Sequence, residues 1–144
     1  MTARLGAHCL KHGSNVQRTI SLSSGESEYY ALVKGAAMGL SMQSMMKDWG
    51  IALAVKLLTD SSAAKGVTDR LGLGKLRHIQ TRYLWLQERV HAKHLSVEKV
   101  PGQHNVADIL TKSTSAEVLE RHMKSLNQFR REGRSSEAKG LLSA

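Results

Sequence analysis

Residues 22–32 read Leu22-Ser23-Ser24-Gly25-Glu26-Ser27-Glu28-Tyr29-Tyr30-Ala31-Leu32. Ser23 followed three residues later by Glu26 has the form of a capping box, in which a hydroxyl and a carboxylate satisfy free backbone N–H groups at a helix start. We therefore expect a long helix from Glu26 to Trp49. Its apolar residues recur at spacings of three, four or seven, so a methionine-rich face should pack in the core rather than form a cofactor groove. They are Ala31, Met38, Met42, Met45 and Trp49.

Two apolar runs downstream predict strands. Residues 55–59 are apolar, apart from one lysine and a closing threonine, and end at Asp60, which is typical of a buried strand. Residues 95–100 alternate between apolar and polar and are stopped by Pro101. Helices between such strands favour parallel pairing, so these runs predict a mixed α/β fold.

Upstream, a hairpin is predicted. Residues 18–24 alternate polar and apolar side chains, and residues 5–10 could form a second short strand joined to them by a turn over 12–15. Shorter helices are expected over 61–68, 79–92 and 105–112, and from the capping pair Thr114 and Glu117 to about Arg131. We expect one domain over residues 1–126, followed by a basic flexible tail over 127–144.

The charge of the chain is positive and unevenly distributed. Its 21 Lys and Arg exceed its 12 Asp and Glu, which gives a formal charge of +9. Only residues 26–64 hold more acids than bases, four against three. A basic surface around one slightly acidic patch fits an enzyme that acts on nucleic acid through a bound metal, and it also fits a generally basic soluble protein.

The sequence gives no sign of a secreted or membrane protein. Cys9 is the single cysteine, so it has no partner for an internal disulfide. No stretch approaches the ~18 apolar residues of a membrane helix, and residues 1–20 lack the apolar block of a signal peptide. We expect an intracellular protein, cytoplasmic or nuclear, without a membrane partner.

Three carboxylates stand where folds often place chemistry. Glu28 lies in the first turns of the long helix, Asp60 follows a strand, and Asp108 lies near the start of a late helix. If these ends converge, the three can share Mg²⁺, which prefers oxygen ligands, and two such ions can promote phosphodiester hydrolysis. On spacing alone, isolated acids near helix starts are more commonly partners of the helix dipole.

The sequence around these acids resembles the ribonuclease H domains of copia-type retroelements. Residues 22–32 are similar to that family's pattern L-S-S-x-E-A-E-Y-x-A-L. Asp60-Ser61-Ser62-Ala63-Ala64 looks like D-[NS]-x-[SA]-A, and residues 75–83 are similar to K-H-I-x-x-R-Y. Val100-Pro101 followed by residues 107–112 matches V-P…A-D-I-L-T-K. These four blocks keep the family's order and span roughly residues 18–112.

The resemblance implies a ribonuclease-H-like mixed sheet flanked by helices, with Mg²⁺, or Mn²⁺ in its place, as cofactor. Glu28, Asp60 and Asp108 then match metal-ligating and catalytic positions. Asn105 would orient the substrate or the loop. His104 stands near the place of a catalytic histidine of cellular ribonucleases H, and an exposed loop histidine is the alternative.

Further roles follow from the same resemblance. Ser61, His78 and Arg82 match positions expected to contact nucleic acid, although His78 and Arg82 could equally pack against the helix. Glu26 is matched as well, and we interpret it as the capping acid rather than a metal ligand. Trp85 is expected in the core.

One departure from the family concerns its first metal ligand, an aspartate on an opening strand that resembles D-A-D-W. This chain has no Asp or Glu before Glu26, and His8, Cys9 and His12 are soft ligands poorly suited to Mg²⁺. Either the chain is truncated, which we favour, or a separate polypeptide supplies the strand. Its loss would expose a sheet edge.

The implied activity is hydrolysis of the RNA strand of RNA–DNA hybrids during reverse transcription, beside the reverse transcriptase domain of the same polyprotein. Hybrid shape and 2′-hydroxyl groups would provide the specificity. With three of four carboxylates, we expect reduced or absent activity, and whether the chain is an enzyme is left open. A catalytically inactive nucleic-acid-binding remnant is one alternative. An unrelated helical DNA-binding module, without strands at 18–24, 55–60 and 95–100, is another.

Overall fold

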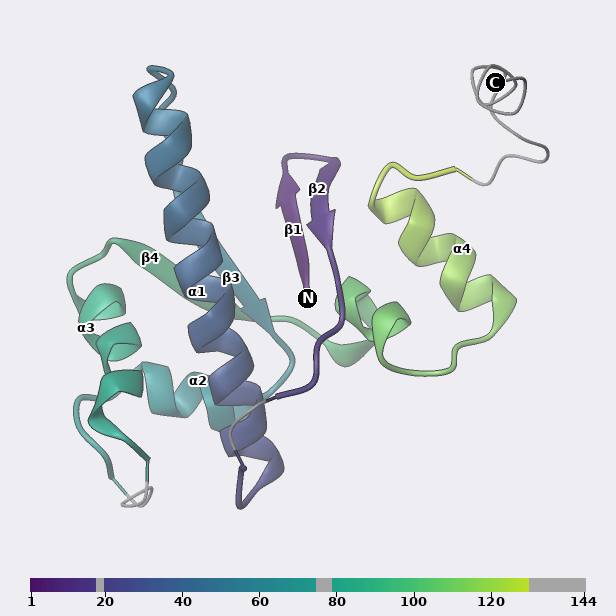
Figure 1. Ribbon diagram of the computed structural model, residues 1–144. Coiled ribbons are helices and arrows are strands. Elements are labelled where there is room, and N and C mark those ends of the chain that lie inside the picture. The colour runs from purple at the N-terminus through teal and green to yellow at the C-terminus, as the bar shows by residue number, and fades with distance from the viewer. Residues whose placement is uncertain (18–19, 75–78, 130–144) are drawn as a thin grey trace, which may run out of the picture.

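The computed structural model describes residues 1–17, 20–74 and 79–129. Figure 1 shows a long central helix with a hairpin on one side and a parallel strand pair with two short helices on the other. The elements are β1 (Thr2–Leu5), β2 (His8–His12), α1 (Ser24–Asp48), β3 (Val55–Thr59), α2 (Ser62–Thr68), α3 (Trp85–His91), β4 (Leu95–Lys99) and α4 (Ala116–Ser125). Turns of 3-10 helix lie at η1 (Thr81–Tyr83), η2 (Gly102–His104) and η3 (Val106–Leu110).

The described strands form two separate pairs. β3 and β4 are parallel, in a register that runs from Val55 opposite Leu95 to Thr59 opposite Lys99. The predicted strands at 55–59 and 95–100 and their parallel pairing are thus confirmed, and the fold is mixed α/β. A purely helical DNA-binding module is excluded by this pair.

The N-terminal hairpin differs from its prediction. β1 and β2 pair antiparallel, and the chain reverses at Gly6, whose φ of +57° suits glycine in a tight turn. The predicted turn at 12–15 is therefore wrong. Residues 20–23 form no strand because Ser23 already caps α1, and residues 18–19 lie outside the described residues.

Helix α1 begins as its capping pattern predicts. The Ser23 hydroxyl accepts a hydrogen bond from the backbone N–H of Glu26 at 3.2 Å. The Glu26 carboxylate accepts from the backbone N–H of Leu22 at 2.9 Å and from the Tyr30 hydroxyl at 2.5 Å, with Glu26 only 1% exposed. The interpretation of Glu26 as the capping acid is confirmed.

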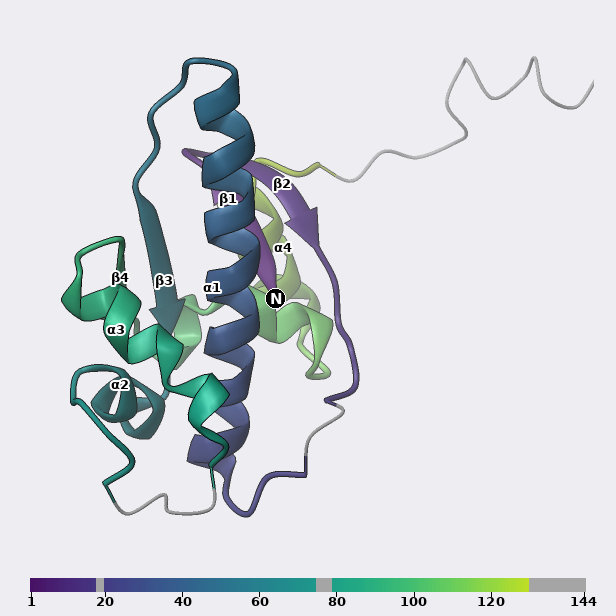
Figure 2. The same cartoon turned by 60° about the vertical axis from the view of Figure 1, so that its left-hand side comes forward.

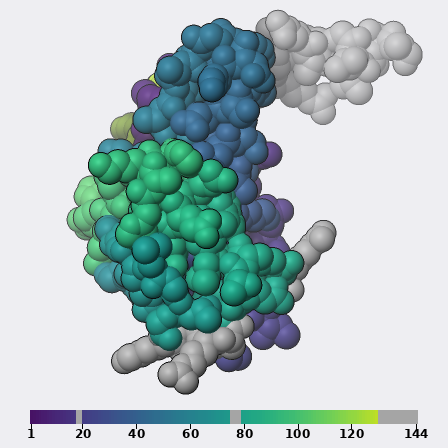
Figure 3. All heavy atoms as spheres, turned by 90° about the vertical axis from the view of Figure 1, so that its left-hand side faces the viewer, coloured from purple at the N-terminus to yellow at the C-terminus, as the bar shows by residue number. Residues whose placement is uncertain are grey.

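The expected methionine-rich core face of α1 is wrong, and Ala31, which was placed on it, is exposed as well. Met45 is 46% exposed and Trp49 68%, whereas the buried α1 residues lie between Glu26 and Ala36. Five-residue strands extend about 17 Å, and a 25-residue helix extends about 37 Å, so one such strand pair covers only half of α1. Figures 2 and 3 show the uncovered end of α1 projecting beyond α2 and α3.

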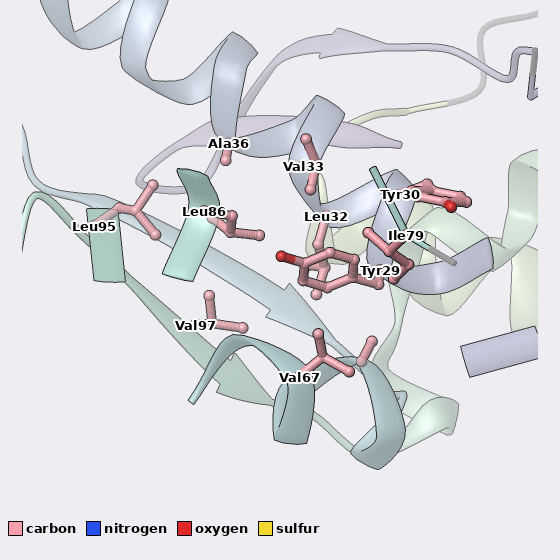
Figure 4. Close-up of a cluster of buried hydrophobic side chains, with 11 residues drawn as sticks. Tyr29, Tyr30, Leu32, Val33, Ala36, Val67, Ile79, Leu86, Leu95 and Val97 are labelled. Atoms are coloured by element: carbon pink, nitrogen blue, oxygen red, sulfur yellow. The ribbon is translucent and has the colours of Figure 1, made fainter. Parts of the chain in front are cut away.

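The core lies where α1 meets β4, α2 and α3 (Figure 4). Tyr29 is fully buried, and its hydroxyl donates to the carbonyl of Tyr83 at 2.7 Å. Trp85 packs half-buried against the same cluster, as expected. The buried cluster comprises Tyr29, Tyr30, Leu32, Val33, Ala36, Ala64, Val67, Ile79, Leu86, Leu95 and Val97.

The later helices are shorter than predicted. The predicted helix at 79–92 is a 3-10 turn followed by α3, because the Tyr83 carbonyl binds Tyr29 and the N–H of Gln87 bonds to Leu84 instead. The predicted helix at 105–112 is the 3-10 turn η3.

The predicted C-terminal helix starts and ends at other residues. α4 is capped by Ser115 rather than Thr114, and it ends at Ser125, two residues before the left-handed Asn127 (φ +54°). Most of the predicted tail over 127–144, including Arg131, lies outside the described residues.

Candidate functional site

Asp60 stands directly after β3, at the carboxyl end of the strand. The Thr59 hydroxyl accepts from the backbone N–H of Ser61 at 3.1 Å, and the Ser61 hydroxyl caps α2 by accepting from Ala64 N–H at 3.1 Å. These two hydrogen bonds fix the backbone of the residues that follow Asp60. Ser61, predicted to contact nucleic acid, is thereby occupied as a helix cap.

Asn105 joins two of the predicted ligands. Its Nδ2 donates to Asp60 Oδ2 and to Asp108 Oδ1, each at 3.3 Å, while its Oδ1 accepts from the backbone N–H of Ala107 at 3.2 Å. The end of β3 and the turn η3 are thus held together by one side chain. The expectation that Asn105 orients the loop has its geometric basis here.

Glu28 belongs to the same electrostatic cluster. Partial burial raises the pKa of its carboxyl, the charges of Asp60 and Asp108 raise it further, and Lys112 opposes them. All three carboxylates line one groove of about 1160 Å³ that runs between β1, α1 and β3. The structure therefore brings Glu28, Asp60 and Asp108 to one place.

Lys112 is the residue of this cluster that the sequence analysis did not single out. Its Nζ lies 2.8 Å from Asp108 Oδ2. This hydrogen bond and the charge of Asp108 raise the pKa of the lysine, with smaller contributions from Asp60 and Glu28. The spacing of four residues between Asp108 and Lys112 was the available signal.

The three carboxylates are suitable ligands for a hard divalent cation, since carboxylate oxygens are the ligands that Mg²⁺ prefers. Within residues 1–17, 20–74 and 79–129, however, no three His, Cys, Asp or Glu side chains are close enough to hold a metal ion as they stand. Asp60 and Asp108 lie near enough to Glu28 to raise the pKa of its carboxyl, and a cation would have to draw the three carboxylates closer.

The other predicted residues are placed less centrally. His104 is exposed in η2, lines the same groove, and contacts Gln103 at 3.5 Å. The Arg82 guanidinium is exposed and lies 5.1 Å from the centre of the Tyr83 ring, and its contact with nucleic acid stays a prediction. His78 lies outside the described residues.

The chain is similar to the retrovirus-related Pol polyprotein from transposon TNT 1-94 of Nicotiana tabacum, with 28% identity over 101 residues. The match covers 69% of this chain and 8% of the length of that polyprotein. No family model matches the chain, and no solved structure does. None of the described helices could cross a membrane. The similarity supports a retrotransposon Pol origin.

Proposed function

We propose that this chain is a ribonuclease-H-like domain of a retroelement polyprotein. Its ancestral reaction is Mg²⁺-dependent hydrolysis of the RNA strand of RNA–DNA hybrids during reverse transcription. The observation that carries the proposal is the meeting of Glu28, Asp60 and Asp108 at one groove, with Asn105 bonded to two of them. Elements far apart in the sequence contribute these acids, which favours a chemical role over solvation of separate helix ends.

Each residue of the cluster has a defined part. Glu28, Asp60 and Asp108 would hold the cation through their carboxylate oxygens, and Asn105 keeps Asp60 and Asp108 oriented toward each other. When bound, the metal would supply an activated water and neutralise charge on the phosphate. Lys112 offsets part of the negative charge of the cluster, so a divalent cation competes with its ammonium for Asp108.

The substrate follows from charge and shape. A formal charge of +9 attracts a phosphate backbone, and hybrid duplexes are recognised by their shape and 2′-hydroxyl groups rather than by sequence. The reverse transcriptase domain of the same polyprotein is the proposed neighbour, because it produces such hybrids.

We propose that the activity of this chain is weak. The Lys112 ammonium lies 2.8 Å from Asp108 Oδ2, and this contact disfavours cation entry. The alternative is a domain that binds hybrids with little or no hydrolysis. The three acids, one of which already binds Lys112, favour this alternative at low metal concentration.

A hybrid-cleavage assay with Mg²⁺ or Mn²⁺ tests the proposal. Asp60→Asn should reduce the rate at least tenfold. Asp48→Asn is the matched control, because Asp48 ends α1 about 30 Å along the helix from Glu28 and should leave the rate unchanged. Equal rates for the unmodified chain and Asp60→Asn would contradict hydrolysis. Hybrid binding that persists and weakens with salt would then support the inactive alternative.

A further inference from the structure

We propose that a second pocket, at the carboxyl end of α3, binds single-stranded nucleic acid. This basic pocket has a volume of about 560 Å³. It is lined by Leu40 and Gln43 of α1, Trp85 and Arg89 of α3, and Lys93 and His94 of the turn into β4. The binding needs neither a metal nor the three carboxylates, so it does not depend on the proposed hydrolysis.

The basic pocket and the candidate site lie at opposite ends of the parallel strand pair (Figure 1). Asp60 directly follows β3, whereas His94 directly precedes β4. Five paired residues separate these two ends by about 17 Å. Gln43 and Trp85 also line the groove that holds the carboxylates, and Gln43 lies about 22 Å along α1 from Glu28. The pocket therefore opens into the groove far from the carboxylates, and a strand bound there leaves them free.

The cationic side chains of the basic pocket are not paired with acids. Arg89 Nη1 lies 3.1 Å from His94 Nδ1, so the guanidinium meets a histidine ring rather than a carboxylate. In the described part of the chain, no Asp or Glu oxygen lies within 4.0 Å of the side-chain nitrogens of Arg89, Lys93 or His94. Among the described residues that line the pocket there is no acid either. Cations without a counter-charge attract the phosphates of nucleic acid.

Lys93 occupies a backbone position that favours glycine. Its φ is +57°, in the turn that ends α3. The N–H of Lys93 donates to the carbonyl of Val90, and the N–H of His94 donates to that of Arg89, each at 3.0 Å. These bonds already satisfy the last carbonyls of the helix, so the lysine side chain is not needed as a cap. A cation near a helix end is favourable, but a lysine at a neighbouring position would supply one without left-handed backbone. What this position adds is an ammonium in the basic pocket.

Trp85 provides the aromatic side of the basic pocket. It is half-buried at the start of α3 and stands four residues before Arg89, so the indole and the guanidinium lie on the same face of the helix. An aromatic ring beside cations is typical of single-strand binding, because a base stacks on the ring while the cations hold its phosphate. The bases of a duplex are already stacked on one another. The pocket therefore favours an unpaired strand.

The test titrates the full chain, carrying Trp49→Phe, with a ten-nucleotide thymidine DNA strand in EDTA. Trp49→Phe leaves Trp85 as the single tryptophan, and we expect saturable quenching of its fluorescence that weakens with salt. Arg89→Gln combined with Lys93→Gln should weaken binding about tenfold or more. The control combines Lys11→Gln with Lys124→Gln, which removes two charges from exposed positions of β2 and α4 and should weaken binding less than about threefold.

Lys93→Gly separates a role in binding from a role in folding. Glycine favours left-handed backbone, so this variant should melt at the same temperature as the unmodified chain or higher. It should nevertheless bind the DNA strand more weakly, with the slope of log affinity against log salt reduced by about one. Asn127→Gly is the matched control and should leave binding unchanged, because Asn127 is the other non-glycine residue of the described chain with left-handed backbone, at φ +54°.

Three results would overturn the proposal: no quenching at millimolar DNA, unchanged binding in the Arg89 and Lys93 double variant, or equal loss of binding in Lys93→Gly and Asn127→Gly. A ten-residue glutamate peptide that binds as tightly would assign the pocket to an acidic polypeptide. A blunt duplex of the same length that binds as tightly would assign it to duplexes, and either result would also overturn the proposal. EDTA removes divalent cations, so failure here and failure of the hybrid-cleavage assay are distinguishable.

Discussion

Asn105 donates its side-chain amide to Asp60 at 3.3 Å, across 45 residues of sequence. Asp60 follows β3, and Asn105 precedes η3 after β4, so this bond ties together the ends of two parallel strands. This hydrogen bond can form only when β3 and β4 pair in the correct register. The candidate site is therefore a product of the sheet and not of any one segment.

Replacing Asn105 should cost stability. Asn105→Ala removes the bonds to Asp60 and Asp108 and the cap of η3, and it leaves two carboxylates facing each other without a donor between them. We expect a loss of about 1–3 kcal/mol in the free energy of unfolding, measured by urea denaturation. Gln103→Ala, at an exposed neighbouring position, should change it by less than about 0.5 kcal/mol. Similar values for both would show that the Asn105 bonds contribute nothing.

Glu28 should make the stability depend on pH. Its folded-state pKa is raised above the ordinary 4.5 by burial and by Asp60 and Asp108, so the folded state favours the protonated acid. The contribution of the protonated Glu28 carboxyl to the free energy of unfolding is present in full below pH 4.5, and it is lost as pH rises through the raised pKa. Glu28→Gln should therefore raise the melting temperature at pH 7, by less than the ~4 °C that 1 kcal/mol gives, and should not raise it at pH 4. Thermal melts at both pH values check this, and a variant less stable at pH 7 would contradict it.

Gly25 sets the distance between α1 and α2. A Cβ atom there would lie 2.8 Å from the Cβ of Ala63, so Gly25→Ala should push the helices apart and cost about 1–3 kcal/mol. Gly66→Ala is the matched control, because its Cβ would meet nothing within 4 Å and alanine favours helix by about 1 kcal/mol. Denaturation of the two variants should give shifts of opposite sign. Stabilisation by both would show that the helix contact is looser than described.

His122 should destabilise the fold in mild acid. This residue of α4 is 4% exposed, and burial, followed by the charge of Arg121, lowers its pKa below 6.5, with His104 acting in the same direction and Asp108 against it. Because the folded-state pKa is depressed, the contribution of neutral His122 to the free energy of unfolding is present in full above pH 6.5. It is lost as pH falls through the lowered pKa.

His122→Asn should remove that part of the pH dependence, measured by denaturation between pH 5 and 8. His91→Asn, at the exposed end of α3, is the control and should keep the slope of the unmodified chain. An unchanged slope in His122→Asn would contradict the assignment to this histidine.

The sequence by itself determined the features that depend on neighbouring residues. The Ser23–Glu26 spacing set the start of α1, and the apolar runs at 55–59 and 95–99 set the two parallel strands, with Pro101 ending the second. Capping, alternation and the missing N–H of proline act over a few residues, so these elements could be predicted without the fold.

Tertiary structure decided the rest. The Tyr29 hydroxyl donates to the Tyr83 carbonyl, so α3 begins later than predicted. The short strands leave half of α1 uncovered. Asn105 and Lys112 hold the acids in one cluster. Each of these depends on atoms brought together from distant segments, and local patterns carry no information about such contacts. The sequence was therefore enough to identify the candidate carboxylates. Only the packing of α1 against the β3–β4 pair decided that they share a groove.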